Sequence, residues 1–210
     1  MAARILDGKS VARRLTEETA RQARMLTERT GVVPGLGVVM VGDDPASVSY
    51  VTGKERACAA LGFHSRECRL PATATLADLL AVIRGRHDAP AIHGILVQPP
   101  LPRQIDEQAA IAAIHPDKDV DGFTPVNVGR MMIGQPCFLP CTPHGIIHLL
   151  IDRGIETAGR HAVVVGRSNI VGKPVAHLLM RKAAGGNATV TVCHTGTRDL
   201  ALYTRQADIL

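Results

Sequence analysis

A tyrosine and a lysine four residues apart form the first pair that could act together on one ligand. Tyr50 and Lys54 lie in the segment SYVTGK at 49–54, inside a helical pattern, so their side chains share one helix face. A lysine can act as a general acid or base, although its ordinary pKa of about 10.4 must fall by roughly three units for base chemistry near neutral pH. Gly53 costs a helix roughly 1 kcal/mol relative to alanine, which suggests that something approaches the backbone closely there. The alternative for this segment alone is an exposed lysine beside a packing tyrosine.

Two further segments follow predicted strands, at the positions where parallel-sheet enzymes place their ligands. Gln98 leaves a buried strand and enters the rigid proline loop PPLP at 99–102, so we expect its amide to be held in place. The segment PDKDVDGF at 116–123 contributes three aspartates. Such a cluster could bind a divalent metal, but without further oxygen ligands it is more typical of a solvated turn. The sequence therefore predicts no metal site.

A glycine-bounded loop, GRSNIVGKP at 166–174, follows a short apolar run and precedes a helical pattern. Gly166 gives the backbone freedom to turn, and we expect N–H groups at the helix start to face an anion that the helix dipole favours. Compared with the dinucleotide fingerprint G-x-G-x-x-G, the loop has Ser168 and Val171 at the second and third glycine positions and adds Gly172. The loop predicts a phosphate site, and the alternative is an ordinary strand-to-helix turn.

Helical and strand patterns alternate along the whole chain. Predicted strands cover 36–41, 63–70, 92–97, 161–165 and 189–193, and predicted helices cover 10–29, 47–61, 75–86, 105–114, 145–153, 173–184 and 199–206. We expect Thr142 to supply the N-cap oxygen of the 145–153 helix, with Pro143 at the first helical position. Short apolar strands separated by helices predict an α/β fold with parallel sheets and helices on both faces.

The periodicity fades between 116 and 140, where glycine and proline become frequent, which indicates a connection between domains. We therefore expect a catalytic α/β domain at 1–140 and a Rossmann-like dinucleotide-binding domain at 141–210. The second domain contains only about half of a doubly wound sheet, and 208–210 resembles the opening of a third strand. We expect the chain to be truncated relative to its natural protein, the alternative being a small protein that ends in an edge strand.

The composition argues against several functional classes. The chain has 24 lysines and arginines and 19 aspartates and glutamates, for a net charge of +5, but no run of five basic residues. This argues against a nucleic-acid partner and fits an anionic small ligand. The five cysteines form no C-x-x-C pair and no zinc spacing with histidine, which indicates reduced thiols in a cytoplasmic protein. No apolar run approaches 18 residues and the N-terminus lacks a signal-peptide core, so we expect no membrane association.

Five motifs occur together in a fixed order. They are YxxxK at 50–54, QPPLP at 98–102, PDKDVDGF at 116–123, PCTP at 140–143 and GRSNIVGKP at 166–174. In these motifs and their spacing, the chain resembles the bifunctional methylenetetrahydrofolate dehydrogenase and methenyltetrahydrofolate cyclohydrolase family over nearly all of its length. It departs at Pro99, where the family usually has leucine, and in lacking the family's C-terminal portion.

The resemblance implies a role for each residue of the expected folate site. Lys54 is the catalytic lysine, and Gln98 hydrogen-bonds it. Tyr50 packs on the pterin and helps to orient the one-carbon bridge, and its neighbour Ser49 belongs to the same site. Asp121 binds the paired N–H donors of the pterin, which an acceptor-only carboxylate matches. The resemblance also implies that folate binds between two α/β domains, that NADP binds the second, and that the chain forms a homodimer through its dinucleotide domains.

The choice of cofactor can be argued from the residues alone. An NAD enzyme usually has Asp or Glu at the end of the second strand, about 20 residues past the loop, to hold the ribose 2′-hydroxyl. The segment VCHTGTR at 192–198 has no acid at the strand end, and Arg167 lies in the loop, so NADP is favoured. The expected cofactor-binding residues are Gly166, Arg167, Ser168, Gly172, Thr195 and Arg198.

Two other functions remain open on the sequence. A shikimate-type dehydrogenase also joins a substrate domain to a dinucleotide domain, but it does not call for the Tyr50, Lys54 and Gln98 combination. A non-catalytic NADP- or folate-binding module is the alternative of another class, and the expected truncation favours it.

Overall fold

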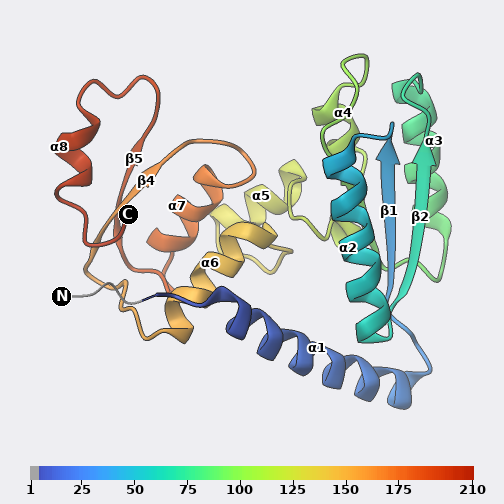
Figure 1. The fold of residues 1–210 in the computed structure, drawn as a ribbon, viewed down its shortest axis with the longest axis horizontal. Helices are drawn as coiled ribbons and strands as arrows, with labels where there is room; N and C mark the ends of the chain where they lie inside the picture. Colours follow the sequence, from blue (N-terminus) through green and yellow to red (C-terminus); the bar gives the residue numbers. More distant parts are fainter. Residues whose placement is uncertain (1–4) are drawn as a thin grey trace. The chain divides into compact units, whose positions relative to one another are not determined.

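The computed structural model describes residues 5–210, in which eight α-helices, five strands and one 3-10 helix follow one another (Figure 1). In chain order these are α1 (Gly8–Thr30), β1 (Gly35–Val41), α2 (Pro45–Leu61), β2 (His64–Leu70), α3 (Leu76–Asp88), β3 (Gly94–Gln98), α4 (Glu107–Ala112), η1 (Pro116–Lys118), α5 (Pro125–Met132), α6 (Cys141–Asp152), β4 (His161–Val165), α7 (Gly172–Met180), β5 (Thr189–Cys193) and α8 (Leu200–Thr204). Within 5–210, no helix has the length and apolar character needed to cross a membrane.

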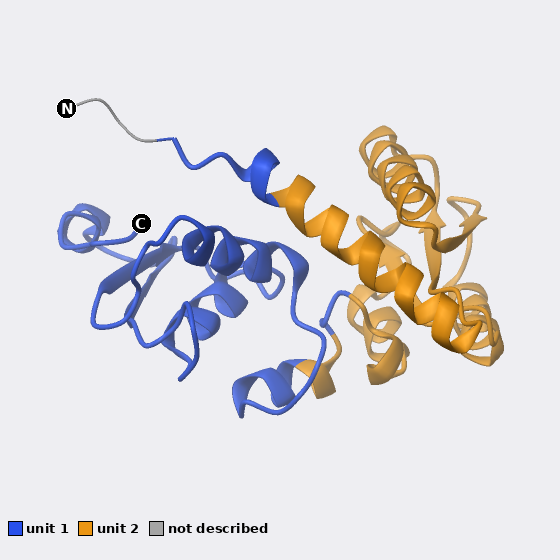
Figure 2. Ribbon diagram, turned by 90° about the horizontal axis from the view of Figure 1, so that it is seen from below, with its two compact units in different colours: residues 1–11, 121–123, 128–210 blue, residues 12–120, 124–127 orange. Residues whose placement is uncertain are grey.

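The chain divides into two compact units (Figure 2). Unit 2 comprises Ala12–Val120 and Thr124–Asn127, and unit 1 comprises Asp121–Phe123, Val128–Leu210 and the N-terminal residues up to Val11. Helix α1 therefore contributes to both units. The domain boundary expected after residue 140 stays a prediction.

Unit 2 is built on a parallel sheet with strand order β2-β1-β3. Alternate residues of β1 belong to different cores, as the pleat of a strand requires. Val39 and Val41 pack in one cluster with Leu79 of α3, whereas Val38 and Met40 pack in another with Val51 of α2. Helices therefore cover both faces of the sheet, as the alternating pattern predicted.

Unit 1 contains the parallel pair β4-β5. Ala162 of β4 is paired with Val190 of β5 and also bridges to Ile209, whose carbonyl accepts from the backbone N–H of Val163 at 2.8 Å. The expected opening of a third strand is therefore present, at the edge of β4 opposite β5. Helices α6 and α7 pack on this sheet through an apolar cluster that includes Ile147, Leu150, Ala162, Val175, Leu178 and Leu179.

The predicted start of α6 was wrong. The helix begins at Cys141 with Pro140 as its N-cap residue, without a capping side chain, and the N–H of His144 makes the first turn's bond to the Pro140 carbonyl at 2.9 Å. Pro143 is thus the third helical residue rather than the first. Proline fits there because the first turn's N–H groups have no partner within the helix.

Helix α5 was missed because Gly129 interrupts a short segment rich in turn-forming residues. A signal for it exists in the dipeptide at 124–125, since a threonine followed by proline is a common start of a helix. In the structure the Thr124 hydroxyl accepts from the Asn127 backbone N–H at 3.3 Å. Helix α7 is also shorter than predicted and ends at Met180.

Candidate functional site

Helix α2 and strand β3 bring the expected catalytic lysine to the end of the sheet. The Lys54 ammonium nitrogen donates to Oε1 of Gln98, the last residue of β3, at 2.8 Å. Lys54 is half-buried and Gln98 is only 8% exposed. The hydrogen bond implied by the family resemblance is therefore present, and it links two residues that are 44 positions apart in the sequence.

The amide of Gln98 is fixed at its other end as well. Its Nε2 donates to the carbonyl of Pro99 at 2.7 Å, and the Ser47 hydroxyl donates to the same carbonyl at 3.3 Å. Ser47 is 3% exposed, and its backbone N–H donates to the carboxylate of Asp44, the N-cap of α2. Hydrogen bonds from Ser47 lower the pKa of Asp44. These contacts restrict the orientation of the Gln98 oxygen that receives Lys54.

Ser47 was not among the predicted site residues. The spacing of Asp44, Pro45 and Ser47 signals a capped helix start, but no sequence pattern shows that the serine hydroxyl reaches a loop 52 residues away. Ser49, which was expected to bind the substrate, is exposed on α2, and its role stays a prediction. The serine that contacts the Gln98 loop is therefore Ser47.

Tyr50 lies one turn before Lys54 on α2, and its side chain is 66% exposed. At Gly53, between them, an added Cβ would have no atom of the described residues within 4 Å. No protein atom of the described residues approaches this backbone, so the expected close approach at Gly53 stays a prediction for a ligand. The α2 surface beside Lys54 is open, and a flat ring could lie on it next to Tyr50.

The three aspartates at 116–123 have separate environments. Asp119 is 2% exposed, and its carboxylate accepts from the backbone N–H of Thr124 at 2.8 Å and from Nδ2 of Asn127 at 2.9 Å. A bridge from Asp119 to Ile95 ties the segment to β3. These contacts show that Asp119 stabilises the loop. Separately, no group of three or more metal-ligating side chains occurs within 5–210.

Asp121, expected to bind the pterin, lies two residues further on and is half-buried. It belongs to unit 1, whereas Tyr50, Lys54 and Gln98 all belong to unit 2. Within unit 2 the structure thus brings together the three residues expected to act on the one-carbon bridge.

The loop between β4 and α7 folds tightly on its own backbone. Gly166 has a φ of 137°, and its N–H donates to the carbonyl of Cys193 at the end of β5 at 2.8 Å. A Cβ at position 172 would overlap the carbonyl of Gly166, so only glycine fits there. Gly172 therefore fills the close-packing role that the third glycine has in the dinucleotide fingerprint.

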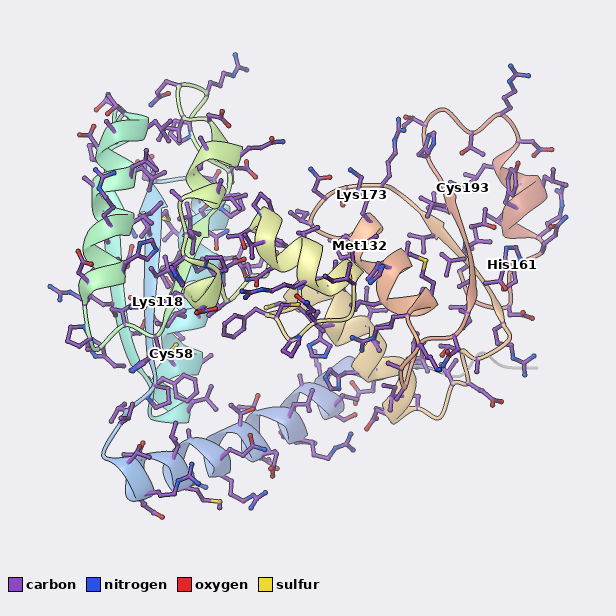
Figure 3. The ribbon with its side chains drawn as sticks, turned by 180° about the vertical axis from the view of Figure 1, so that it is seen from behind. Cys58, Lys118, Met132, His161, Lys173 and Cys193 are labelled. Atoms are coloured by element: carbon purple, nitrogen blue, oxygen red, sulfur yellow. The ribbon has the colours of Figure 1, made fainter. Side chains whose placement is uncertain are left out.

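Ser168 occupies the N–H groups that were expected to face a ligand. Its hydroxyl accepts from the backbone N–H groups of Val171 and Gly172, both at 3.2 Å. Its backbone carbonyl accepts from the backbone N–H of Lys173 at 3.0 Å. That expectation was wrong for these three donors because the loop caps its own helix. Lys173 lies at the start of α7 (Figure 3), and its ammonium group donates to Asn169 at 2.6 Å.

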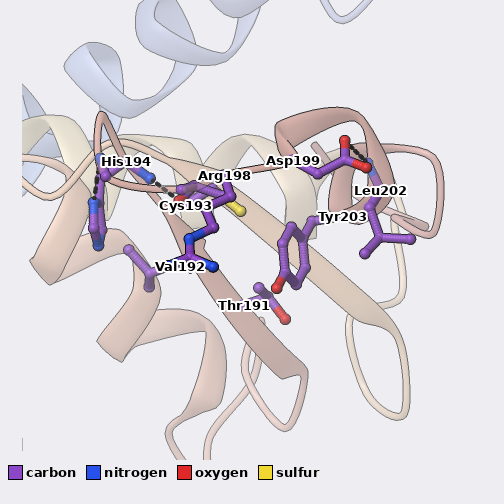
Figure 4. A pocket seen from close by; sticks show the side chains of 10 residues that line it. Thr191, Val192, Cys193, His194, Arg198, Asp199, Leu202 and Tyr203 are labelled. Atoms are coloured by element: carbon purple, nitrogen blue, oxygen red, sulfur yellow. Dashed lines mark hydrogen bonds between the residues drawn. The ribbon is translucent and has the colours of Figure 1, made fainter.

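A cavity of about 450 Å³ lies between the end of β5 and α8 (Figure 4). Arg198 and Tyr203 line it, whereas Thr195 is exposed and does not. The lining carboxylate of Asp199 accepts from the Leu202 N–H at 3.0 Å and so caps α8. The cavity therefore presents a guanidinium that could pair with a phosphate, beside a carboxylate that caps a helix.

Both halves of the chain match known protein families. Residues 6–121 match the catalytic domain of tetrahydrofolate dehydrogenase/cyclohydrolase, and residues 140–210 match the NAD(P)-binding domain of the same family. The bifunctional protein FolD of Dehalococcoides mccartyi is 56% identical over 210 residues, which are 100% of this chain and 71% of that protein. FolD of Geobacillus thermodenitrificans is 53% identical over 100% of this chain and 72% of its own length.

Solved structures agree with the sequence matches. The bifunctional FolD enzyme of Campylobacter jejuni superposes with a TM-score of 0.94 at 44% identity, covering 99% of this chain and 72% of that chain. The Trypanosoma brucei methylenetetrahydrofolate dehydrogenase-cyclohydrolase, solved with NADP cofactor and inhibitor, has a TM-score of 0.92 at 38% identity and covers 99% and 71%. The chain therefore belongs to the tetrahydrofolate dehydrogenase/cyclohydrolase family.

Proposed function

We propose that this protein oxidises 5,10-methylenetetrahydrofolate to 5,10-methenyltetrahydrofolate with NADP and hydrolyses the product to 10-formyltetrahydrofolate. The observation that carries the proposal is the 2.8 Å hydrogen bond between Lys54 and Gln98 beside the open face of α2. It holds a titratable amine where a flat, ring-shaped substrate could lie. The family matches over both halves of the chain support the same pair of reactions.

Lys54 is the general acid and base of the hydrolysis. Water adds to the electrophilic methenyl carbon and loses one proton, which leaves a carbinolamine. The hydroxyl proton is then removed as the C=O bond of the formyl group forms, the C–N bond to one ring nitrogen breaks, and that nitrogen is protonated. An amine held by a neutral amide can transfer these protons without losing its position, because the Gln98 oxygen accepts a hydrogen bond from either protonation state.

The folate itself is positioned by residues around this pair. Tyr50, exposed one turn away on the same helix, packs on the pterin and orients the one-carbon bridge, with Ser49 beside it. Asp121 accepts from the amino and ring N–H groups of the pterin. The contact with Tyr50 brings the bridge to Lys54, so the protein contributes proximity as well as proton transfer.

The loop after β4 and the cavity beside β5 hold NADP. Gly166, Ser168 and Gly172 shape the loop, and the guanidinium group of Arg167, with help from Thr195 or Arg198, binds the 2′-phosphate. NADP supplies the hydride acceptor for the methylene carbon. Preference over NAD follows because a charge-assisted contact between an arginine and the 2′-phosphate contributes about 1.5 to 3 kcal/mol.

The same proposal covers the organisation of the protein. A folate-binding domain at 1–140 and an NADP-binding domain at 141–210 work as a homodimer in the cytoplasm, without nucleic-acid or membrane partners. All five cysteines are free thiols, which supports a reducing compartment.

A two-stage assay tests the function. Purified protein is mixed with methylenetetrahydrofolate and NADP, and the formation of NADPH and of the methenyl intermediate is followed by absorbance. Methenyltetrahydrofolate is then supplied alone and its hydrolysis is followed. We expect turnover in both assays, with NAD supporting a slower first reaction. Binding of both ligands without turnover in either assay would identify a non-catalytic module instead.

A further inference from the structure

Two histidines lie in contact on one face of α6, outside the proposed folate and NADP sites. His144 and His148 are four residues apart, so their side chains extend from successive turns of the same helix. Their ring centroids are 4.4 Å apart and the planes are inclined at 52°. Among the nine histidines of the sequence, no other two have this spacing.

The ring nitrogens of this pair are not used by the fold. Six other histidines place a ring nitrogen in a hydrogen bond, namely His87, His93, His115, His161, His177 and His194. Within 5–210, the ring nitrogens of His144 and His148 make no such bond. None of these nitrogens is fully buried, so the lack of a protein partner leaves no buried polar atom unsatisfied. Both side chains are half-buried, and because their unbonded ring nitrogens are not fully buried, these nitrogens keep some contact with solvent.

The surroundings of His144 disfavour its protonated form. Burial, the neighbouring His148 ring and the Arg181 guanidinium of the segment after α7 all lower the pKa of His144. A neutral imidazole has a free lone pair, which is the form that coordinates metals. Imidazole nitrogen suits zinc, nickel and copper ions, whereas magnesium and calcium prefer oxygen ligands.

We propose that His144 and His148 chelate one divalent transition-metal ion of the zinc, nickel or copper class, with water in the remaining coordination positions. Two histidines at i and i+4 on a helix supply two nitrogen ligands from one face, as they do in helical zinc sites. The site has two protein ligands, because no group of three metal-ligating side chains occurs among the described residues. This metal site is independent of the proposed enzyme function.

Cys141 is the thiol that could compete for the metal from the same helix, whose other candidate ligand, Asp152, is paired with Arg153. Cys141 lies three residues before His144, is exposed, and supplies a softer donor atom. The proposal excludes it from the site, so a variant of Cys141 separates histidine chelation from binding by the thiol.

The experiment uses untagged, EDTA-treated, reduced protein titrated with Ni²⁺ in a calorimeter. We expect one ion to bind per chain, and affinity to fall by about tenfold or more in each of His144→Gln and His148→Gln, since loss of even an outer partner of a metal ligand costs about that much. His64→Gln changes an exposed histidine on β2 and is the matched control, and Cys141→Ser tests the thiol. Both should bind Ni²⁺ as the unsubstituted chain does. Unchanged affinity in either single variant of the pair, or loss of binding in Cys141→Ser, overturns the proposal.

A second measurement avoids reliance on the folding of variants. Diethylpyrocarbonate modifies accessible neutral imidazoles, and mass spectrometry locates the modified residues. In the unsubstituted protein, Ni²⁺ should protect His144 and His148 together and leave His64 reactive. Protection of another histidine, or of neither member of the pair, contradicts the assignment.

Discussion

Replacing Gln98 by leucine should slow hydrolysis while leaving the fold intact. The substitution removes the acceptor of the 2.8 Å bond from Lys54 and the donor of the 2.7 Å bond to Pro99. A hydrogen bond to a charged group contributes about 1.5 to 3 kcal/mol. If that bond positions Lys54 in the transition state, its loss corresponds to a fall of roughly 10- to 100-fold in kcat.

The structure predicts a small effect of the same substitution on stability. Leucine has a volume close to that of glutamine, the Pro99 carbonyl keeps the hydroxyl of Ser47 as a partner, and the half-buried ammonium of Lys54 can reach water. We expect the free energy of unfolding to change by about 1 kcal/mol or less. Methenyltetrahydrofolate hydrolysis is followed by absorbance, and thermal unfolding is recorded in parallel.

Ser47→Ala is the matched control, because it removes the longer bond to the same Pro99 carbonyl without touching Lys54. Its kcat should stay within a few-fold of the unsubstituted enzyme. A Gln98→Leu enzyme with normal kcat and normal thermal stability would refute the positioning role of Gln98. Equal losses in both variants would show that the proline loop, rather than the bond to Lys54, controls the rate.

Three further outcomes follow from the structure. Arg167→Ala should reduce the ratio of NADP to NAD affinity by about tenfold, measured by calorimetry, and an unchanged ratio would remove Arg167 from the 2′-phosphate site. Gly172→Ala forces a Cβ into the backbone of the loop, so it should weaken NADP binding while methenyl hydrolysis continues. Gly145→Ala is the control, because the added Cβ would have no atom of the described residues within 4 Å. Equal NADP affinity in the two variants would contradict the close-packing role of Gly172. Burial lowers the pKa of His87 and of His144 below the ordinary 6.5, so the unfolded chain binds more protons there. The stability contributed by these two histidines is complete above about pH 6.5 and is lost as the pH falls through their lowered pKa values. Urea unfolding at a series of pH values measures this loss, and His87→Gln should make the free energy of unfolding fall less steeply with pH. An unchanged dependence of the free energy of unfolding on pH would exclude His87 as a cause.

The periodic elements of the fold could be predicted from the sequence because they depend on local pattern. Strand β1 reads as a continuous apolar run since it is buried on both faces, and Gly62 ends α2 in the left-handed conformation that glycine adopts easily. Helix α5 and the start of α6 could not be placed correctly, because both lie where proline and glycine obscure the helical pattern.

The residues of the proposed site were named from their motifs and stay predictions, but several contacts that the structure shows around them could not be predicted. Ser47 and Gln98 meet at one carbonyl through the packing of α2 against the sheet, which no spacing in the sequence encodes. Ser168 looked like a replacement for a glycine in a ligand-binding loop, whereas its hydroxyl caps α7. Such contacts depend on tertiary structure rather than on local pattern.

The most direct test of the catalytic centre is the rate of methenyltetrahydrofolate hydrolysis by Lys54→Ala, measured together with its folate affinity. Lys182→Ala, which changes an exposed lysine after α7, is the control. We expect hydrolysis to be abolished in Lys54→Ala while folate binding largely persists, because Tyr50 and the rest of the site remain. Hydrolysis within a few-fold of the control, at equal folate affinity, would contradict the assignment of Lys54 as the group that transfers the protons.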